Sequence, residues 1–245
     1  MPPLKTKPRR WRRLLFHLLF PIPVGAVVLL IQPLWLIDAL ARAEPGILWR
    51  VDTAEPLAAL TFDDGPDAEN TPKVLDILKE HGAHATFFLI GGHARARPDL
   101  VARIRAEGHD VGNHTHGKEG TFRQPEPAFE ASVIEAERLL GLEKTEPRFL
   151  RPASGFIRRE QLEWVTQRGY RCVLGSAWPY DSAQPPVGYM VWLVGKNLRP
   201  GTIVVMHDEG ERARTLAALP GILAAGKEKG LRFVTLTELW SRRRS

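Results

Sequence analysis

The chain has 245 residues, of which 44% are hydrophobic, enough for one large domain or two small ones with a sizeable core. Its formal net charge is +6. Six basic residues precede the first acidic one: Lys5, Lys7, Arg9, Arg10, Arg12 and Arg13. Without them the chain carries 28 basic and 28 acidic residues, so the excess charge belongs to a tail and a nucleic-acid-binding face is not expected. The single cysteine, Cys172, excludes an internal disulfide and a cysteine-based metal site.

Residues 14–37, directly after the basic tail, are almost uncharged and slightly longer than the roughly 20 residues that span a bilayer. Basic residues before such a span place the N-terminus in the cytoplasm and the rest of the protein outside it. Small residues at 39–43 also permit a cleaved signal peptide, although its apolar region normally has only about 7–15 residues. We therefore predict a basic tail and membrane anchor at residues 1–43, or alternatively a signal peptide and a secreted protein. Residues 44–245 form the predicted main domain.

From residue 46 onward, short apolar runs alternate with helical patterns. Seven core strands are expected at residues 57–62, 85–90, 110–112, 148–150, 171–174, 202–206 and 232–236, with a short leading strand at 47–51. Four of the helices end in a glycine that leads straight into a strand. Alternating strands and helices form a parallel sheet, so the expected fold class is α/β. An open doubly wound sheet and a closed barrel both fit this pattern.

Residues suited to catalysis follow the strands, and the strand interiors lack them. Asp63 and Asp64 follow the first core strand, His114 the third, Arg151 the fourth and His207 the sixth. The carboxyl ends of the strands are where α/β barrels place their active sites. A random scatter of turn aspartates and core histidines would not sort in this way, so the pattern predicts an enzyme.

Adjacent residues at a strand end point in different directions. One of Asp63 and Asp64 can therefore hold a metal while the other accepts a proton. Taken alone, the sequence Asp-Asp-Gly-Pro would favour a simple turn. His114 and His116 share a face if the backbone stays extended, and imidazole with a carboxylate makes a zinc site. Without Asp64, a polar loop would explain these histidines equally well.

Two further residues extend the predicted site. His207 ends a fully apolar strand and reaches the mouth of the sheet, although a core histidine bonded to backbone is the alternative. Arg151 is placed to pair with a carboxylate, which would lower the pKa of that carboxylate and fix its orientation.

Four short motifs, in this order, resemble those of the NodB-homology polysaccharide deacetylases, a carbohydrate esterase family. They are TFDDG at residues 61–65, NHT at 113–115, RPASG at 151–155 and VMHD at 205–208. The resemblance covers about residues 57–240. It implies a distorted (β/α) barrel of about seven parallel strands. It also implies a metal-dependent hydrolase that removes N- or O-acetyl groups from glycans such as peptidoglycan, chitin oligomers or xylan. The basic tail and apolar span predict that the catalytic domain lies outside the cytoplasm, and no protein partner is predicted.

By the same resemblance, Asp63 is the general base, Arg151 orients it, and His207 is the general acid. Asp64 and His114 hold a divalent metal, zinc or alternatively cobalt. Asp181, in the run Trp178-Pro179-Tyr180-Asp181, is the candidate carboxylate that supports His207.

The chain departs from the family pattern at the metal site. The family usually has a second metal histidine four residues after the first, and this position is Lys118. His116 or Glu119 is the candidate third ligand, unless the site has two protein ligands. Alternative functions are a carbohydrate-binding relative without turnover and a phosphotransferase with Asp63 as nucleophile. The usual Asp-x-Asp spacing and a phosphate-binding glycine loop are missing, which disfavours the phosphotransferase.

Overall fold

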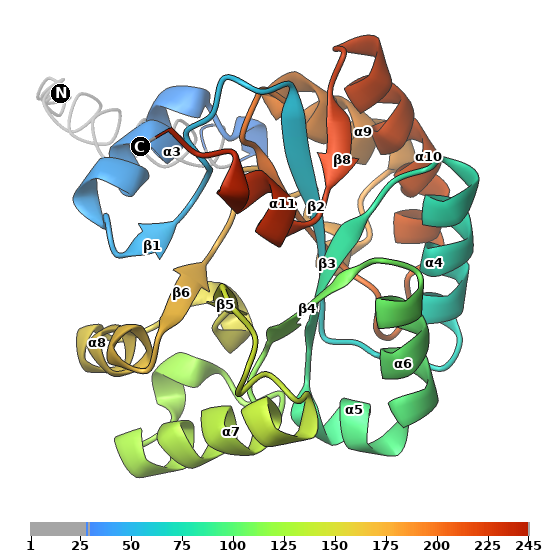
Figure 1. Ribbon diagram of the computed structural model, residues 1–245. Coiled ribbons are helices and arrows are strands. Elements are labelled where there is room, and N and C mark those ends of the chain that lie inside the picture. Colours follow the sequence, from blue (N-terminus) through green and yellow to red (C-terminus); the bar gives the residue numbers. More distant parts are fainter. Residues whose placement is uncertain (1–27, 29, 245) are drawn as a thin grey trace, which may run out of the picture.

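The computed structural model describes residues 28 and 30–244, in which helices surround a barrel-like sheet (Figure 1). The strands are β1 (Ile47–Leu48), β2 (Leu57–Asp63), β3 (Ala85–Leu89), β4 (Asp110–Asn113), β5 (Arg148–Leu150), β6 (Tyr170–Val173), β7 (Ile203–His207) and β8 (Arg232–Val234). The helices are α3 (Leu34–Ala43), α4 (Asn70–Glu80), α5 (Gly91–Ala96), α6 (Pro98–Ala106), α7 (Glu126–Leu139), α8 (Arg159–Gln167), α9 (Val187–Asn197), α10 (Ala213–Glu228) and α11 (Leu236–Ser241). Short 3₁₀ helices are η1 (Thr121–Arg123), η2 (Ala153–Gly155) and η3 (Asp181–Ala183).

Within the described residues, the strands form one parallel sheet in the order β1-β6-β5-β4-β3-β2-β7, with β8 also paired to β2. Near its two edges, Ala177 forms a parallel bridge with Val204, and Arg50 an antiparallel bridge with Thr202. Isolated bridges, not full strand pairs, thus join β7 to segments next to β6 and β1. The parallel α/β sheet is confirmed, and its seven-strand path is consistent with a distorted (β/α) barrel.

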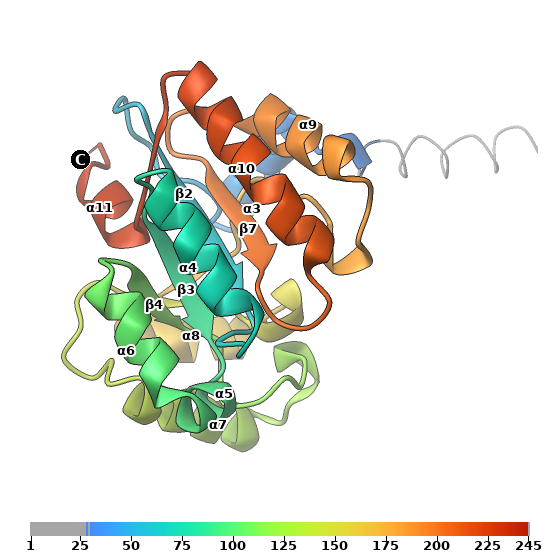
Figure 2. The ribbon, with the colours of Figure 1, turned by 90° about the vertical axis from the view of Figure 1, so that its right-hand side faces the viewer.

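Strand β2 shows how the sequence specifies the two faces of the sheet. All seven of its residues are buried. Successive side chains of a strand point to opposite faces. Leu60 and Phe62 belong to the outer core cluster, which also contains residues of α4, α9 and α10. These helices cover β2 and β7 from outside (Figure 2). Leu57 and Ala59 belong to a second cluster, on the face that also carries Asp63.

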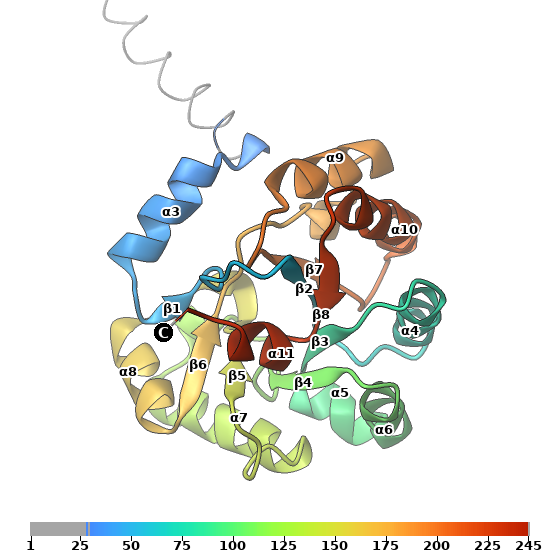
Figure 3. The ribbon, with the colours of Figure 1, turned by 45° about the horizontal axis from the view of Figure 1, so that its top comes forward.

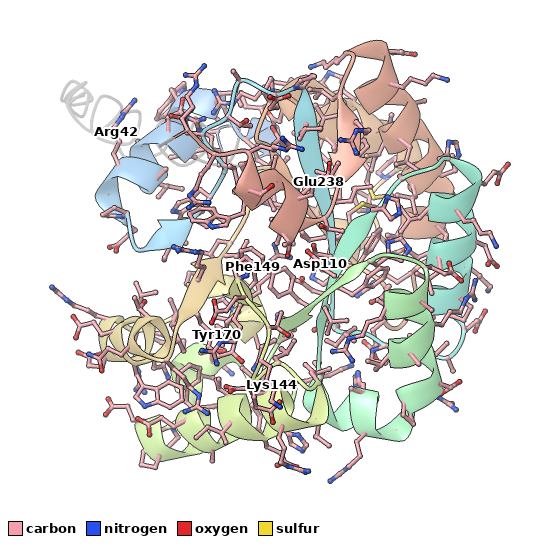
Figure 4. The ribbon with its side chains drawn as sticks, in the orientation of Figure 1. Arg42, Asp110, Lys144, Phe149, Tyr170 and Glu238 are labelled. Carbon is pink, nitrogen blue, oxygen red and sulfur yellow. The ribbon has the colours of Figure 1, made fainter. Side chains whose placement is uncertain are left out.

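That second cluster closes one end of the barrel. It brings Phe88 and Phe149 (labelled in Figure 4) together with Leu236 and Leu239 of α11. The sequence predicts a strand over residues 232–236, but β8 ends at Val234. Thr235 then caps α11, because its side chain accepts a hydrogen bond from the backbone N–H of Glu238. The functional residues at the carboxyl ends of the strands therefore lie above an apolar floor.

The predicted anchor at residues 14–37 lies largely outside the described residues. Among the helices that the structure describes, none combines the length and the apolar character needed to cross a bilayer. The described end of this segment packs on the barrel. Ile37 is fully buried, and Asp38 lies 2.7 Å from Arg199 and 3.3 Å from Arg50.

Candidate active site

A cavity of about 680 Å³ opens at the carboxyl ends of the strands. Six of the predicted site residues line it: Asp63, Asp64, His114, Arg151, Asp181 and His207. They come from the ends of β2, β4, β5 and β7 and from η3. Trp178 and Tyr180 also line the cavity. The structure therefore brings together residues that are as many as 144 positions apart in the chain.

Asp63 is held by a buried ion pair. Arg151 Nη1 donates to Asp63 Oδ1 at 2.6 Å and to Thr61 Oγ1 at 2.7 Å. The exposed fractions of the two charged side chains are 6% for Asp63 and 3% for Arg151. The guanidinium group also lies over the ring of Phe88. A charge-assisted hydrogen bond in this setting fixes the orientation of the carboxylate. The sequence reasoning missed Thr61, although its place two residues before Asp63 puts both side chains on one face.

Asp64 faces His114 across the pocket. Its backbone φ of +74° turns the chain away from the strand, and its Oδ1 lies 3.4 Å from His114 Nε2. His114 Nδ1 lies 2.8 Å from the carbonyl oxygen of Arg151, which can only accept, so Nδ1 carries a hydrogen. Burial would raise the pKa of Asp64, but the hydrogen bond and charge of His114, with the charges of His207 and Lys118, lower it to about 2.

This pair fits two ligands of one cation. With a cation bound, His114 would be neutral with its hydrogen on Nδ1, so that its Nε2 lone pair and the Asp64 carboxylate would both face the ion. Two zinc ligands at about 2.0–2.2 Å in tetrahedral geometry are ~3.4 Å apart, which matches the observed separation. In the described part of the chain, no group of three or more His, Cys, Asp or Glu residues is arranged to hold a metal.

His116 lies outside this pocket. The prediction that it shares a face with His114 required an extended backbone, but Thr115 between them has a φ of +66°. The turn sends His116 toward α5, where a Cβ on Gly91 would come within 3.0 Å of its Nδ1. Glu119 does not line the cavity either. Of the predicted ligands, the structure brings together Asp64 and His114.

His207 is held by Asp181. The Asp181 carboxylate accepts from His207 Nδ1 at 2.9 Å and from the His207 backbone N–H at 2.8 Å. Thr215 Oγ1 donates to the same carboxylate at 3.2 Å, and Asp181 is only 1% exposed. Burial would lower the pKa of His207, but the hydrogen bond and charge of Asp181, with the charges of Asp63 and Asp64, raise it to about 9. The imidazole is therefore protonated at neutral pH.

A second buried acid, Asp208, supports the loop after β2, a role that the sequence reasoning did not assign. Thr71 Oγ1 donates to its Oδ2 at 2.5 Å. Burial raises the pKa of Asp208 to about 7, although the hydrogen bond from Thr71 opposes the shift. A Cβ on Gly65 would come within 2.6 Å of its Oδ1, so the chain directly after Asp64 has room only for glycine.

Lys118 lines the cavity, and its Nζ lies 2.6 Å from Glu209 Oε1. Its charge is one of the influences that lower the pKa of Asp64. We expect Lys118→His to increase zinc affinity by more than the roughly 10- to 100-fold that outer-shell partners contribute, because it adds a ligand and removes a repelling charge. Calorimetric titration with zinc measures this. Lys118→Met, which removes only the charge, is the matched control; equal affinities of the two variants would contradict a ligand role at this position.

A proton acceptor and a proton donor that face one cavity are what hydrolysis of an amide or ester needs. Fold and site together therefore indicate a hydrolase built on a (β/α) barrel. Comparison with known proteins narrows this class. The family model described as polysaccharide deacetylase matches residues 50–173, and the chain belongs to this family.

Relatives and solved structures agree with this assignment. The chain is 39% identical to a peptidoglycan-N-acetylglucosamine deacetylase of Bacillus cereus over 79% of this chain and 92% of that protein. It is 34% identical to a chitooligosaccharide deacetylase of Sinorhizobium fredii over 74% and 90%. A crystal structure of a peptidoglycan N-acetylglucosamine deacetylase superposes with a TM-score of 0.77 at 35% identity, covering 83% of this chain and 98% of the other. The predicted family and enzyme class are confirmed.

Proposed function

We propose that this protein hydrolyses the N-acetyl groups of a cell-envelope glycan, with peptidoglycan N-acetylglucosamine as first candidate and chito-oligosaccharides as second. The names of its relatives support this substrate class. The observation that carries the proposal is the register of the neighbouring strands β2 and β7. It sets Asp63 opposite His207 and so places a base beside an acid. The apolar segment at residues 14–37 supports a location at the membrane, with the barrel outside the cytoplasm.

The site residues divide the reaction between them. Asp64 and His114 would hold a divalent cation, zinc or cobalt, which would supply Lewis-acid polarisation of the acetyl carbonyl. Asp63, oriented by Arg151, accepts a proton from the attacking water. His207 donates a proton to the leaving amine, so the products are acetate and the free amino sugar. Ser154 lines the cavity wall, and a backbone N–H near it would donate to the developing oxyanion.

The pH dependence should report His207. Because the pKa of His207 is raised to about 9, the donor form prevails below this value and activity should fall as pH rises through it. Asp181→Asn removes the negative charge that opposes the effect of burial on the pKa of His207, although the asparagine oxygen can still accept from Nδ1. We expect the basic limb of the kcat/KM profile to move down by roughly 1–3 pH units. The profile measured with saturating metal checks this; an unchanged basic limb would mean that another group sets it.

Release of acetate tests the proposed function directly. The full chain, purified in detergent, is incubated with peptidoglycan or acetylated chito-oligosaccharides after treatment with a chelator, with and without added zinc or cobalt. The proposal predicts release that depends on the added metal. A carbohydrate-binding relative without turnover would bind the sugar and release no acetate with any divalent metal.

A further inference from the structure

The segment before β1 forms part of the wall of the active site. In Figure 3, α3 lies on the outside of the ring of strands, between α8 and α9. Its Leu40 lines the catalytic cavity, and its Ile37 is fully buried. Asp38 pairs with Arg199 and Arg50, which flank β7 and β1 respectively. Residues that the sequence assigns to an anchor or leader therefore reach the substrate pocket.

Gln32, just before α3, is more deeply buried than its neighbours in the chain. It is 1% exposed and has a φ of +43°. Its Nε2 donates to the carbonyl oxygen of Trp178 at 2.6 Å, and its Oε1 accepts the N–H of Trp178 at 3.2 Å. One side-chain amide thus satisfies both backbone groups of a single residue. Tyr189 and Lys196 of α9 donate to the carbonyl oxygens of Leu30 and Ile31 and fix the adjacent backbone.

Trp178 is the start of the loop that carries Asp181. Backbone hydrogen bonds to β7 hold this chain as far as Ala177. The next residue, Trp178, is bonded to Gln32. Three residues later, Asp181 binds both the backbone N–H and the Nδ1 of His207. Displacement of the loop at Trp178 would therefore shift the carboxylate that orients His207.

We propose that Gln32 is a positioning residue of the active site: it fixes the Trp178–Asp181 loop so that Asp181 holds His207 ready to donate its proton. The catalytic role of His207 rests on the proposed function, whereas the bracing of the loop does not. Cleavage after residue 41 or 43 would remove both Gln32 and Leu40. Residues 30–43 therefore belong to the catalytic unit, and an active protein keeps them.

The test replaces Gln32 by leucine in the full chain, which keeps the size of the side chain and removes both hydrogen bonds. Gln167→Leu, the same change at an exposed glutamine of α8, is the matched control. We expect Q32L to lower kcat by roughly ten- to a hundredfold, as for other misplacements of a catalytic group. KM and zinc affinity should change little. Amide hydrogen exchange should become faster at Trp178 and His207. It should not increase to the same extent at the residues of the outer core cluster.

Each outcome decides the inference. Unchanged kcat and unchanged exchange at Trp178 and His207 would overturn it. A uniform increase of exchange over the barrel, with unaltered kcat per folded molecule, would show a merely structural residue and overturn it too. If the parent chain releases no acetate, the proposed function fails, and local exchange at the two amides alone decides the bracing role. Should Q32L not fold, Gln32→Glu, which can accept from the Trp178 N–H but cannot donate to its carbonyl, gives the same comparison.

Discussion

Asp63→Asn is expected to lower kcat by roughly 10²- to 10⁴-fold, the range for loss of a general base. The asparagine oxygen can still accept from Arg151 Nη1, which lies 2.6 Å from Asp63 Oδ1, so the geometry of the site is preserved. The Asp63 side chain is hydrogen-bonded to Arg151, whereas the Asp64 side chain faces His114, and zinc affinity should therefore change little. Acetate release under metal saturation, together with calorimetric zinc titration, measures both quantities.

Asp64→Asn is the matched comparison, because it makes the same chemical change one residue further on. Asp64 Oδ1 faces His114 Nε2, and loss of its charge should weaken zinc binding as well as activity. The two variants therefore separate the base from the ligand. Substantial turnover by D63N, or equal loss of zinc by both variants, would show that the roles of the two carboxylates are wrongly assigned.

Arg151→Met is expected to destabilise the protein by about 3–5 kcal/mol, the usual cost of removing one partner from a buried ion pair. It leaves the Asp63 carboxylate buried without a counter-ion, since both side chains are almost inaccessible. It also removes the hydrogen bond to Thr61 Oγ1 and the stacking of the guanidinium group on Phe88. Urea denaturation monitored by circular dichroism gives the change in the free energy of unfolding.

The double variant D63N/R151M provides the control. Without the charge of Asp63, the loss of Arg151 leaves no buried unpaired carboxylate, so the double variant should be more stable than R151M alone. Additive destabilisation would show that the two side chains are not energetically coupled. In that case the ion pair would not be what fixes the orientation of Asp63.

Much of the site could be predicted from local sequence, because the carboxyl ends of parallel strands meet at one end of a barrel. Asp63, Arg151 and His207 each follow an apolar run, His114 follows a short strand, and the structure gathers all four around one cavity. The position of Asp181 was inferred without a strand to place it, and the structure puts its carboxylate 2.9 Å from His207 Nδ1. Strand periodicity also predicts that Thr61 lies on the same face as Asp63.

Other features depend on backbone turns and long-range contacts that no local pattern encodes. The positive φ of Thr115 separates His116 from His114. The bond between Gln32 and Trp178 joins positions 146 residues apart, and an apolar N-terminal run gives no sign of it. The pairing of Lys118 with Glu209 likewise requires the folded arrangement of two loops. The sequence predicts that the last strand continues to residue 236, but β8 ends at Val234. Val234 and Leu236 are both apolar and buried, one in a strand and one in a helix, so their pattern does not mark the strand end.

The most direct test of the account is a crystal structure of the full chain soaked in zinc, with anomalous diffraction recorded at the zinc absorption edge. We predict one strong anomalous peak within about 2.0–2.2 Å of both Asp64 Oδ1 and His114 Nε2, with Asp63 still bound to Arg151. Absence of a peak between these two atoms at saturating zinc, or a peak coordinated by Asp63 or His116 instead, would contradict it.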